Sequence, residues 1–259
     1  MLRKGDLTQG GIITTLLQFT LPMLAGSLLQ QCYNIADTLI VGQCIGANAL
    51  AAVGSAYTLM VFLISILLGL SMGSGTVFSL QYGAGDLSAL RRSIYVSLLL
   101  IGTVTILLNV AVFLWLDPIL RWLQVPYDIY SLMRNYLWII FWGIVFTFLY
   151  NFYAALLRAV GDSVTPLWFL AVSVVLNIGL DLFLILVLDQ GIEGAAVATV
   201  IAQGTAASGI LLYTYKTRPE LRLHREDMCF DRSSLREITS FSTLTCVQQS
   251  VMNFGILMV

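Results

Sequence analysis

Two polar side chains with the spacing of a helical turn, Asn177 and Asp181, lie within an otherwise apolar stretch of the chain. Residues four apart share one face of a helix. Asp181 is the one charged residue between Ser163 and Leu188. A lone acid in a segment long enough to cross a bilayer is costly and by default marks a transport or ion site. Such a carboxylate can hold a proton or a small cation.

Two further polar residues are expected beside this pair. Asp37 lies shortly before the end of the first apolar segment, and Thr199 lies shortly after the start of the last one. At about 1.5 Å of rise per residue, Asp37, Asp181 and Thr199 should all lie about 8 to 12 Å below the outer face of the membrane. Polar groups from three helices at one depth predict a shared polar pocket. Its members are called here the four site residues: Asp37, Asn177, Asp181 and Thr199.

Other polar positions on the same helices are candidates to support this pocket. Asn34 precedes Asp37 by one turn and Gln203 follows Thr199 by one turn, so each shares a helix side with a site residue. An amide in a membrane helix also commonly bonds a neighbouring helix without binding a ligand, and that alternative stays open for both. Asp37 would reach the aqueous interface if its helix shifted by one turn. Pro22 predicts a bend in that helix, either static or a hinge.

The composition identifies the environment of these residues. Of the 259 residues, 58% are hydrophobic and 10% are charged, whereas about a quarter of the residues of a soluble domain are charged. The chain is therefore predicted to be an integral membrane protein. The net charge of −1 says nothing about a nucleic-acid partner, and no cluster of Lys and Arg interleaved with aromatics occurs to suggest one.

Six apolar runs are long enough to supply the roughly 20 residues that a spanning helix needs. They lie within residues 7–36, 38–85, 93–116, 135–157, 163–188 and 194–215. They lack the alternation of apolar and polar residues that marks a membrane barrel, and backbone groups in lipid must be satisfied within the segment. The predicted fold is an all-α membrane protein with a six-transmembrane-helix bundle, followed by the start of a seventh helix.

The basic residues predict the orientation in the cytoplasmic membrane. If the N-terminus is cytoplasmic, only Arg121 and Arg134 of the 13 Lys and Arg residues lie outside. The inner residues are Arg3, Lys4, Arg91, Arg92, Arg158, Lys216, Arg218, Arg222, Arg225, Arg232 and Arg236. This bias is the positive-inside pattern of a multi-pass protein. Trp115, Trp122 and Trp138 flank an outer connection, where aromatic rings suit the membrane interface.

Several activities find no support in the sequence. No GxxxxGK[ST] phosphate loop occurs, so ATP is not expected to drive the protein. His224 is the only histidine and lies in a charged segment, and no nucleophile with a base and no cluster of metal ligands occurs. An enzyme, a cofactor and a resident metal are therefore not expected. A channel fits the composition, but no repeated selectivity loop is visible.

The segment from Arg158 to Pro166 reads RAVGDSVTP, a tight turn in which Gly161 permits an unusual backbone angle and Pro166 can open the next helix. Together with Pro22 and the four site residues, this turn resembles the multidrug and toxic compound extrusion (MATE) family over the whole chain. The resemblance implies that the four site residues couple H⁺ or Na⁺ to drug export. It also implies that Pro22 is the position at which the first helix bends.

The resemblance further implies the organisation of the chain, because twelve helices form two lobes in that family. Residues 1–215 would form the N-terminal lobe, 216–236 a cytoplasmic inter-lobe loop, and 237–259 the truncated start of the second lobe. Residues 248–259 (QQSVMNFGILMV) align weakly with 30–41 (QQCYNIADTLIV), as an internal repeat would require. The chain is expected to be a fragment that needs the missing C-terminal six-helix lobe for transport.

The activity implied is secondary active efflux of cationic or amphipathic drug-like compounds in antiport with H⁺ or Na⁺, by alternating access. Burial disfavours charged carboxylates, so a proton or Na⁺ can bind among the four site residues. An ion that binds one arrangement of the carrier better than the other shifts the carrier toward it. The alternative is a lipid-linked oligosaccharide flippase of the same superfamily, for which a more cationic cavity is expected than spans without Lys or Arg provide.

Overall fold

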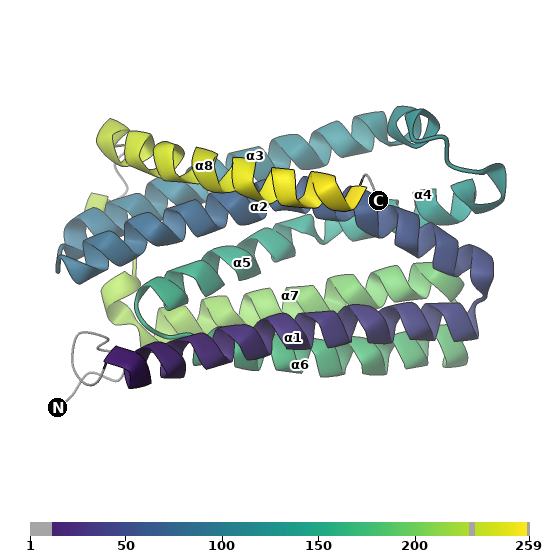
Figure 1. Ribbon diagram of the computed structural model, residues 1–259, viewed down its shortest axis with the longest axis horizontal. Coiled ribbons are helices and arrows are strands. Elements are labelled where there is room, and N and C mark those ends of the chain that lie inside the picture. The colour runs from purple at the N-terminus through teal and green to yellow at the C-terminus, as the bar shows by residue number, and fades with distance from the viewer. Residues whose placement is uncertain (1–11, 228–230, 258–259) are drawn as a thin grey trace.

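Long helices make up nearly all of the chain. The computed structural model describes residues 12–227 and 231–257 (Figure 1), and this part contains no strand. The α-helices are α1 (Ile12–Cys44), α2 (Ala47–Gly83), α3 (Leu87–Trp122), α4 (Tyr127–Trp142), α5 (Ile144–Ala159), α6 (Val164–Leu182), α7 (Gly191–Thr217) and α8 (Arg232–Leu257). A π-helix, η1 (Phe183–Val187), continues α6, and two short 3₁₀ helices follow α7, η2 (Pro219–Leu221) and η3 (Arg225–Asp227).

The predicted spans correspond to α1, α2, α3, the α4–α5 pair, α6 with η1, and α7, and α8 is the seventh helix. Within the described residues, α2, α3, α6 with η1, and α7 are each long and apolar enough to cross a membrane. The α4–α5 pair makes a fifth such segment if it is taken as one span bent by 47°. The predicted all-α membrane bundle is confirmed.

The α4–α5 pair runs through the middle of the bundle (Figure 1), between α2 and α3 on one side and α6 and α7 on the other. α1 packs against α6, and α8 lies along α2. This arrangement brings α1, α4, α6 and α7 around one interior region. The four site residues come from three of these helices.

A break at Gly143 separates α4 from α5. A Cβ atom at Gly143 would lie 2.8 Å from Val200 Cγ2 of α7, so a larger residue would not fit there. The carbonyl of Phe141, next to the break, accepts a hydrogen bond of 2.8 Å from Asn109 Nδ2 of α3. Backbone groups freed by a bend within a bilayer need such partners. The bend therefore depends on both neighbouring helices.

Special backbone geometry holds both ends of α6. Gly161 has a φ of +87°, a conformation that favours glycine, in the RAVGDSVTP turn before the helix. Asp162 Oδ1 then accepts from the Thr165 N–H at 3.0 Å, which satisfies one of the free N–H groups of the first helical turn. At the other end the π-helix η1 begins two residues after Asp181, and π-helical turns frequently occur at functional sites.

The connection from α7 to α8 runs from Arg218 to Asp231, and it folds back onto the bundle through η2 and η3. α8 begins at Arg232, so its first residues lie within the segment 216–236 expected to be a loop. Arg3 and Lys4, two of the residues assigned to the inner side, lie outside the described residues, as does the end of the predicted repeat at Met258 and Val259.

Candidate functional site

The four site residues are all buried. The exposed fraction is 8% for Asp37 on α1, zero for Asn177 and Asp181 on α6, and 4% for Thr199 on α7. They belong to three helices that pack around the same interior region. Sequence spacing placed them at one depth, and helix packing turns their side chains inward.

Contacts among these side chains link the three helices. Asn177 Nδ2 donates to Thr199 Oγ1 at 3.4 Å, and the Tyr33 hydroxyl lies 3.3 Å from the same oxygen. The carboxyl groups of Asp37 and Asp181 are close enough to interact directly across the α1–α6 interface. Thr199 and the two carboxylates therefore belong to one cluster.

Oxygen acceptors without donors distinguish this cluster from an ordinary buried network. Within the described part of the chain, no hydrogen-bond donor reaches Asp37 Oδ1, Asn177 Oδ1 or either carboxylate oxygen of Asp181. A buried carboxylate without a partner costs several kcal/mol or more. These oxygens become satisfied if a proton or a cation binds among them.

The donor set indicates which ion suits the cluster. Carboxylate, amide and hydroxyl oxygens are hard ligands, which suit protons and hard cations such as Na⁺ and do not suit soft transition metals. Over residues 12–227 and 231–257, no group of three or more His, Cys, Asp and Glu side chains could hold a metal ion.

Two tyrosines that were not predicted from the sequence also belong to this site. Tyr33 lies one turn before Asp37 on α1, and Tyr136 on α4 is 5% exposed and lies within electrostatic range of Asp37, Tyr33 and Asp181. The spacing of Tyr33 from Asp37 was a usable signal. Tyr136 carried none, because it lies on another helix and only packing brings it to the carboxylates.

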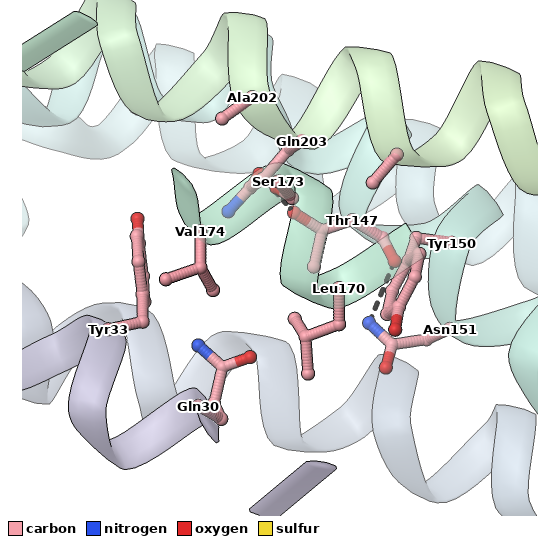
Figure 2. A pocket seen from close by; sticks show the side chains of 11 residues that line it. Gln30, Tyr33, Thr147, Tyr150, Asn151, Leu170, Ser173, Val174, Ala202 and Gln203 are labelled. Carbon is pink, nitrogen blue, oxygen red and sulfur yellow. Dashed lines mark hydrogen bonds between the residues drawn. The ribbon is translucent and has the colours of Figure 1, made fainter. Parts of the chain in front are cut away.

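A cavity of about 100 Å³ adjoins the cluster at Tyr33. Figure 2 shows its polar wall, where Thr147 Oγ1 donates to Gln203 Oε1 at 2.7 Å and Asn151 Nδ2 donates to the Thr147 carbonyl at 2.8 Å. All of its lining side chains are uncharged: Gln30, Tyr33, Thr147, Tyr150, Asn151, Leu170, Ser173, Val174, Ala202, Gln203 and Ala206. The cavity offers amide, hydroxyl and aromatic groups to a bound molecule.

The residues expected to support the site lie in different places. Gln203 lines the cavity (Figure 2). Asn34 is directed toward α2, since its Nδ2 donates to Gln31 Oε1 at 3.2 Å and to the Tyr57 hydroxyl at 3.4 Å. Pro22 lies inside α1, which is helical on both sides of it.

Comparisons with known proteins identify what the chain is similar to. The family model described as MatE matches residues 22–183. The probable multidrug resistance protein YpnP of Bacillus subtilis is 37% identical over 211 residues, which is 82% of this chain and 47% of YpnP. The chain spans about half the length of the curated relatives that it matches.

Solved structures share the fold. One is the outward-facing conformation of a multidrug resistance MATE family transporter of the MOP superfamily, with a TM-score of 0.92, 23% identity, and coverage of 99% of this chain and 57% of that one. Another is a MOP superfamily transporter from Pyrococcus furiosus, described as having a binding pocket of reverse polarity that suggests a different function. Its TM-score is 0.91 at 23% identity, with the same coverage of both chains.

Proposed function

Because the chain belongs to the MatE family of transporters, we propose that it forms the N-terminal lobe of a secondary active multidrug exporter. In this proposal the lobe couples entry of H⁺ or Na⁺ to export of cationic or amphipathic compounds. The observation that supports it most directly is the set of buried oxygens without donors at Asp37, Asn177 and Asp181.

The family consists of multi-pass membrane transporters, so the predictions of a membrane protein and of no enzyme activity are confirmed. The location and orientation are part of the proposal. The protein would lie in the cytoplasmic membrane with its N-terminus inside. The positive-inside pattern supports this orientation, because the connections at the α2–α3, α5–α6 and α7–α8 ends carry most of the basic residues.

Ion binding would change the stability of one arrangement of the lobe. Without an ion, the carboxylates of Asp37 and Asp181 repel each other across the α1–α6 interface. A proton or Na⁺ from outside removes that repulsion and favours closer packing of α1 against α6. An ion shifts the carrier only as far as its affinity differs between the two arrangements. The movement of α1 would reshape the adjoining cavity, because Gln30 and Tyr33 of α1 line it.

The cavity wall supports a cationic or neutral substrate. Its amide, hydroxyl and tyrosine groups carry no positive charge, and aromatic faces attract cations. Compounds of this kind would leave when the ion arrives, since ion binding neutralises the negative charge next to the cavity.

A lipid-linked oligosaccharide flippase of the same superfamily is the alternative. A pyrophosphate headgroup is bound most effectively by Arg and Lys. The cavity of this chain is lined by no charged residue among those described, which favours the exporter.

Transport would also need a second lobe facing this one. In this proposal α8 is the first helix of that lobe, and the complete transporter has two six-helix lobes. A coverage of 57% of the solved transporter supports this division.

Ethidium efflux from cells that express the complete transporter tests the assignment. Asp37→Asn and Asp181→Asn should each abolish gradient-driven efflux while leaving membrane insertion unchanged, because an amide cannot take up a proton and binds a cation weakly. Asp189→Asn is the control, since Asp189 is an exposed acid just after η1. Wild-type efflux in both site variants would refute the assignment. Imposing a pH gradient or a Na⁺ gradient on vesicles then separates the two ions.

A further inference from the structure

A second hollow lies between α4 and α7 near the end of the bundle where α7 begins. Its volume is about 330 Å³, and its lining residues are Arg134, Asn135, Trp138, Ile139 and Glu193. It is called the outer groove below. Unlike the cavity beside the carboxylates, the outer groove is lined by one positive and one negative side chain.

The outer groove faces away from the carboxylate site. Tyr136 is 5% exposed and lies within electrostatic range of that site. Arg134 and Trp138 lie two residues before and after Tyr136, which is roughly 160° around the helix. Trp138 and Trp142, on this side of α4, are 41% and 63% exposed. The outer groove therefore opens on the side of α4 opposite the carboxylate site.

Neighbouring residues hold both charges of the outer groove in place. Arg134 Nε donates to Asp117 Oδ1 at 2.8 Å, and Nη2 lies 3.4 Å from Asp117 Oδ2. These bonds do not use Nη1. Asn135 Nδ2 donates to Glu193 Oε1 at 2.9 Å, a bond that does not use Oε2. A guanidinium nitrogen and a carboxylate oxygen thus remain for a ligand.

The aromatic wall of the outer groove is also held in place. The Trp138 ring packs edge-to-face on Phe113 of α3, with centroids 4.6 Å apart. Tryptophan is enriched at the level of lipid headgroups, where its ring is partly apolar and partly hydrated. An indole face also attracts an ammonium group.

We propose that the outer groove binds the headgroup of a phospholipid that carries a primary amine. The phosphate would accept from Arg134, and the ammonium would donate to Glu193 beside the Trp138 ring. A zwitterionic headgroup can place its phosphate at Arg134 Nη1 and its ammonium at Glu193 Oε2, whereas Glu193 and the Asp117 carboxylate paired with Arg134 both repel a headgroup with negative charge alone. The inference depends on the membrane location of the chain and is independent of which compound the protein transports.

Native mass spectrometry of the full chain, purified in detergent and titrated with phosphatidylethanolamine, phosphatidylcholine or phosphatidylglycerol, tests this proposal. Retention of phosphatidylethanolamine should exceed that of the other two by about two- to fivefold, the range expected of one partly exposed ion pair. Phosphatidylcholine is the informative comparison, because its quaternary ammonium cannot donate a hydrogen bond to Glu193. Equal retention of the three lipids would overturn the proposal without any variant.

A matched pair of variants tests whether the outer groove causes the preference for phosphatidylethanolamine. Glu193→Gln should reduce phosphatidylethanolamine retention to the level of phosphatidylcholine, and Asp128→Asn, an exposed acid in the first turn of α4, should leave the preference intact. An unchanged preference in Glu193→Gln, or an equal loss in Asp128→Asn, would exclude the outer groove as its cause. Displacement of the lipid by soluble phosphoethanolamine would support recognition through the headgroup, and failure of this competition at any concentration would contradict the proposal.

Discussion

Thr199 is the side chain that joins the helices of the carboxylate site, because its hydroxyl contacts both Asn177 and Tyr33. Asn177 and Asp181 are on the same helix, and Tyr33 is one turn from Asp37. The hydroxyl of Thr199 thus orients one neighbour of each carboxylate. At the scale of single residues, the site is an arrangement of oxygens that the Thr199 hydroxyl links across three helices.

Replacement of Thr199 by Val tests this role, since valine keeps the shape and removes the oxygen. Loss of one buried hydrogen-bonding group costs about 1–2 kcal/mol, which corresponds to a five- to thirtyfold change in an equilibrium constant. We expect the concentration of the coupling ion that gives half-maximal efflux by the complete transporter to rise by about this factor.

Thr205→Val is the control for this measurement. Thr205 is an exposed residue of the same helix, and its hydroxyl bonds only the carbonyl of Ile201 in its own helix. An ion dependence that is identical in Thr199→Val and wild type would show that Thr199 does not shape the ion site.

Glycines allow the close approach of α2 and α8. A Cβ atom at Gly69 would lie 2.5 Å from Cys246 Cα, and one at Gly73 would overlap the Ser242 backbone. Thr245 Oγ1 donates to the Gly69 carbonyl at 2.6 Å, and Ser242 Oγ donates to the Leu70 carbonyl at 3.3 Å. Small residues spaced in this way are typical of tightly packed membrane helices.

Gly69→Ala should therefore lower the stability of the chain by about 1–3 kcal/mol, the usual cost of overpacking. Thermal unfolding in detergent, followed by circular dichroism, measures the change. Gly54→Ala on the same helix is the control, because no atom lies within 4 Å of the added Cβ. It should raise stability by about 0.5–1 kcal/mol through helix propensity. Equal effects of the two substitutions would show that α8 does not pack closely on α2 in solution.

At the scale of the whole molecule, hydrogen bonds and ion pairs hold the connection after α7 against the bundle. Arg91 Nε on α3 donates to Asp227 Oδ2 at 2.8 Å, and the His224 N–H donates to the same oxygen at 3.1 Å. Arg218 Nη2 lies 3.4 Å from Asp162 Oδ2 in the turn before α6. Asp162 therefore both accepts from Thr165 in the first turn of α6 and holds the connection through Arg218.

The hydrogen bonds of Asp227 with Arg91 and His224, which hold this connection against the bundle, should depend on pH. Burial acts to raise the pKa of Asp227, but the His224 N–H and the Arg91 guanidinium lower it by more, so its pKa lies below the ordinary value. A lowered pKa in the folded state adds stability that is complete above the ordinary Asp value of about 4 and is lost as the pH falls through the folded value. Amide hydrogen exchange around residue 224, corrected for intrinsic rates, should therefore accelerate below about pH 4 and stay constant above pH 5.

Asp227→Asn should free the connection between α7 and α8 from the bundle at neutral pH. Trypsin cleavage after Arg225 should become about tenfold faster, as expected for loss of a charged hydrogen-bond partner. Glu226→Gln is the matched control, because Glu226 is the exposed neighbour of Asp227. Equal cleavage rates in both variants and the wild type would show that the Arg91–Asp227 pair does not hold the connection.

Much of this molecule followed from properties that are local in sequence. The length of each apolar run determined the helices, because a bilayer requires backbone hydrogen bonds within each segment. The lone Asp181, with Asn177 one turn away, indicated the buried polar site, because an isolated acid in a membrane segment is costly wherever the helix packs. Membrane class and helix order could be read in this way, whereas the role of the four site residues, which are buried, stays a prediction.

Only the tertiary structure decided which faces of these helices meet. Rotation of α1 turns Asn34 toward Tyr57 and Asp37 toward Asp181, and the bent α4–α5 pair brings Tyr136 to the carboxylates. Membrane helices are apolar on nearly every side, so their sequence pattern does not specify rotation as it does for an amphipathic helix. The rotation instead depends on contacts between distant segments, such as those at Gly69 and Gly143.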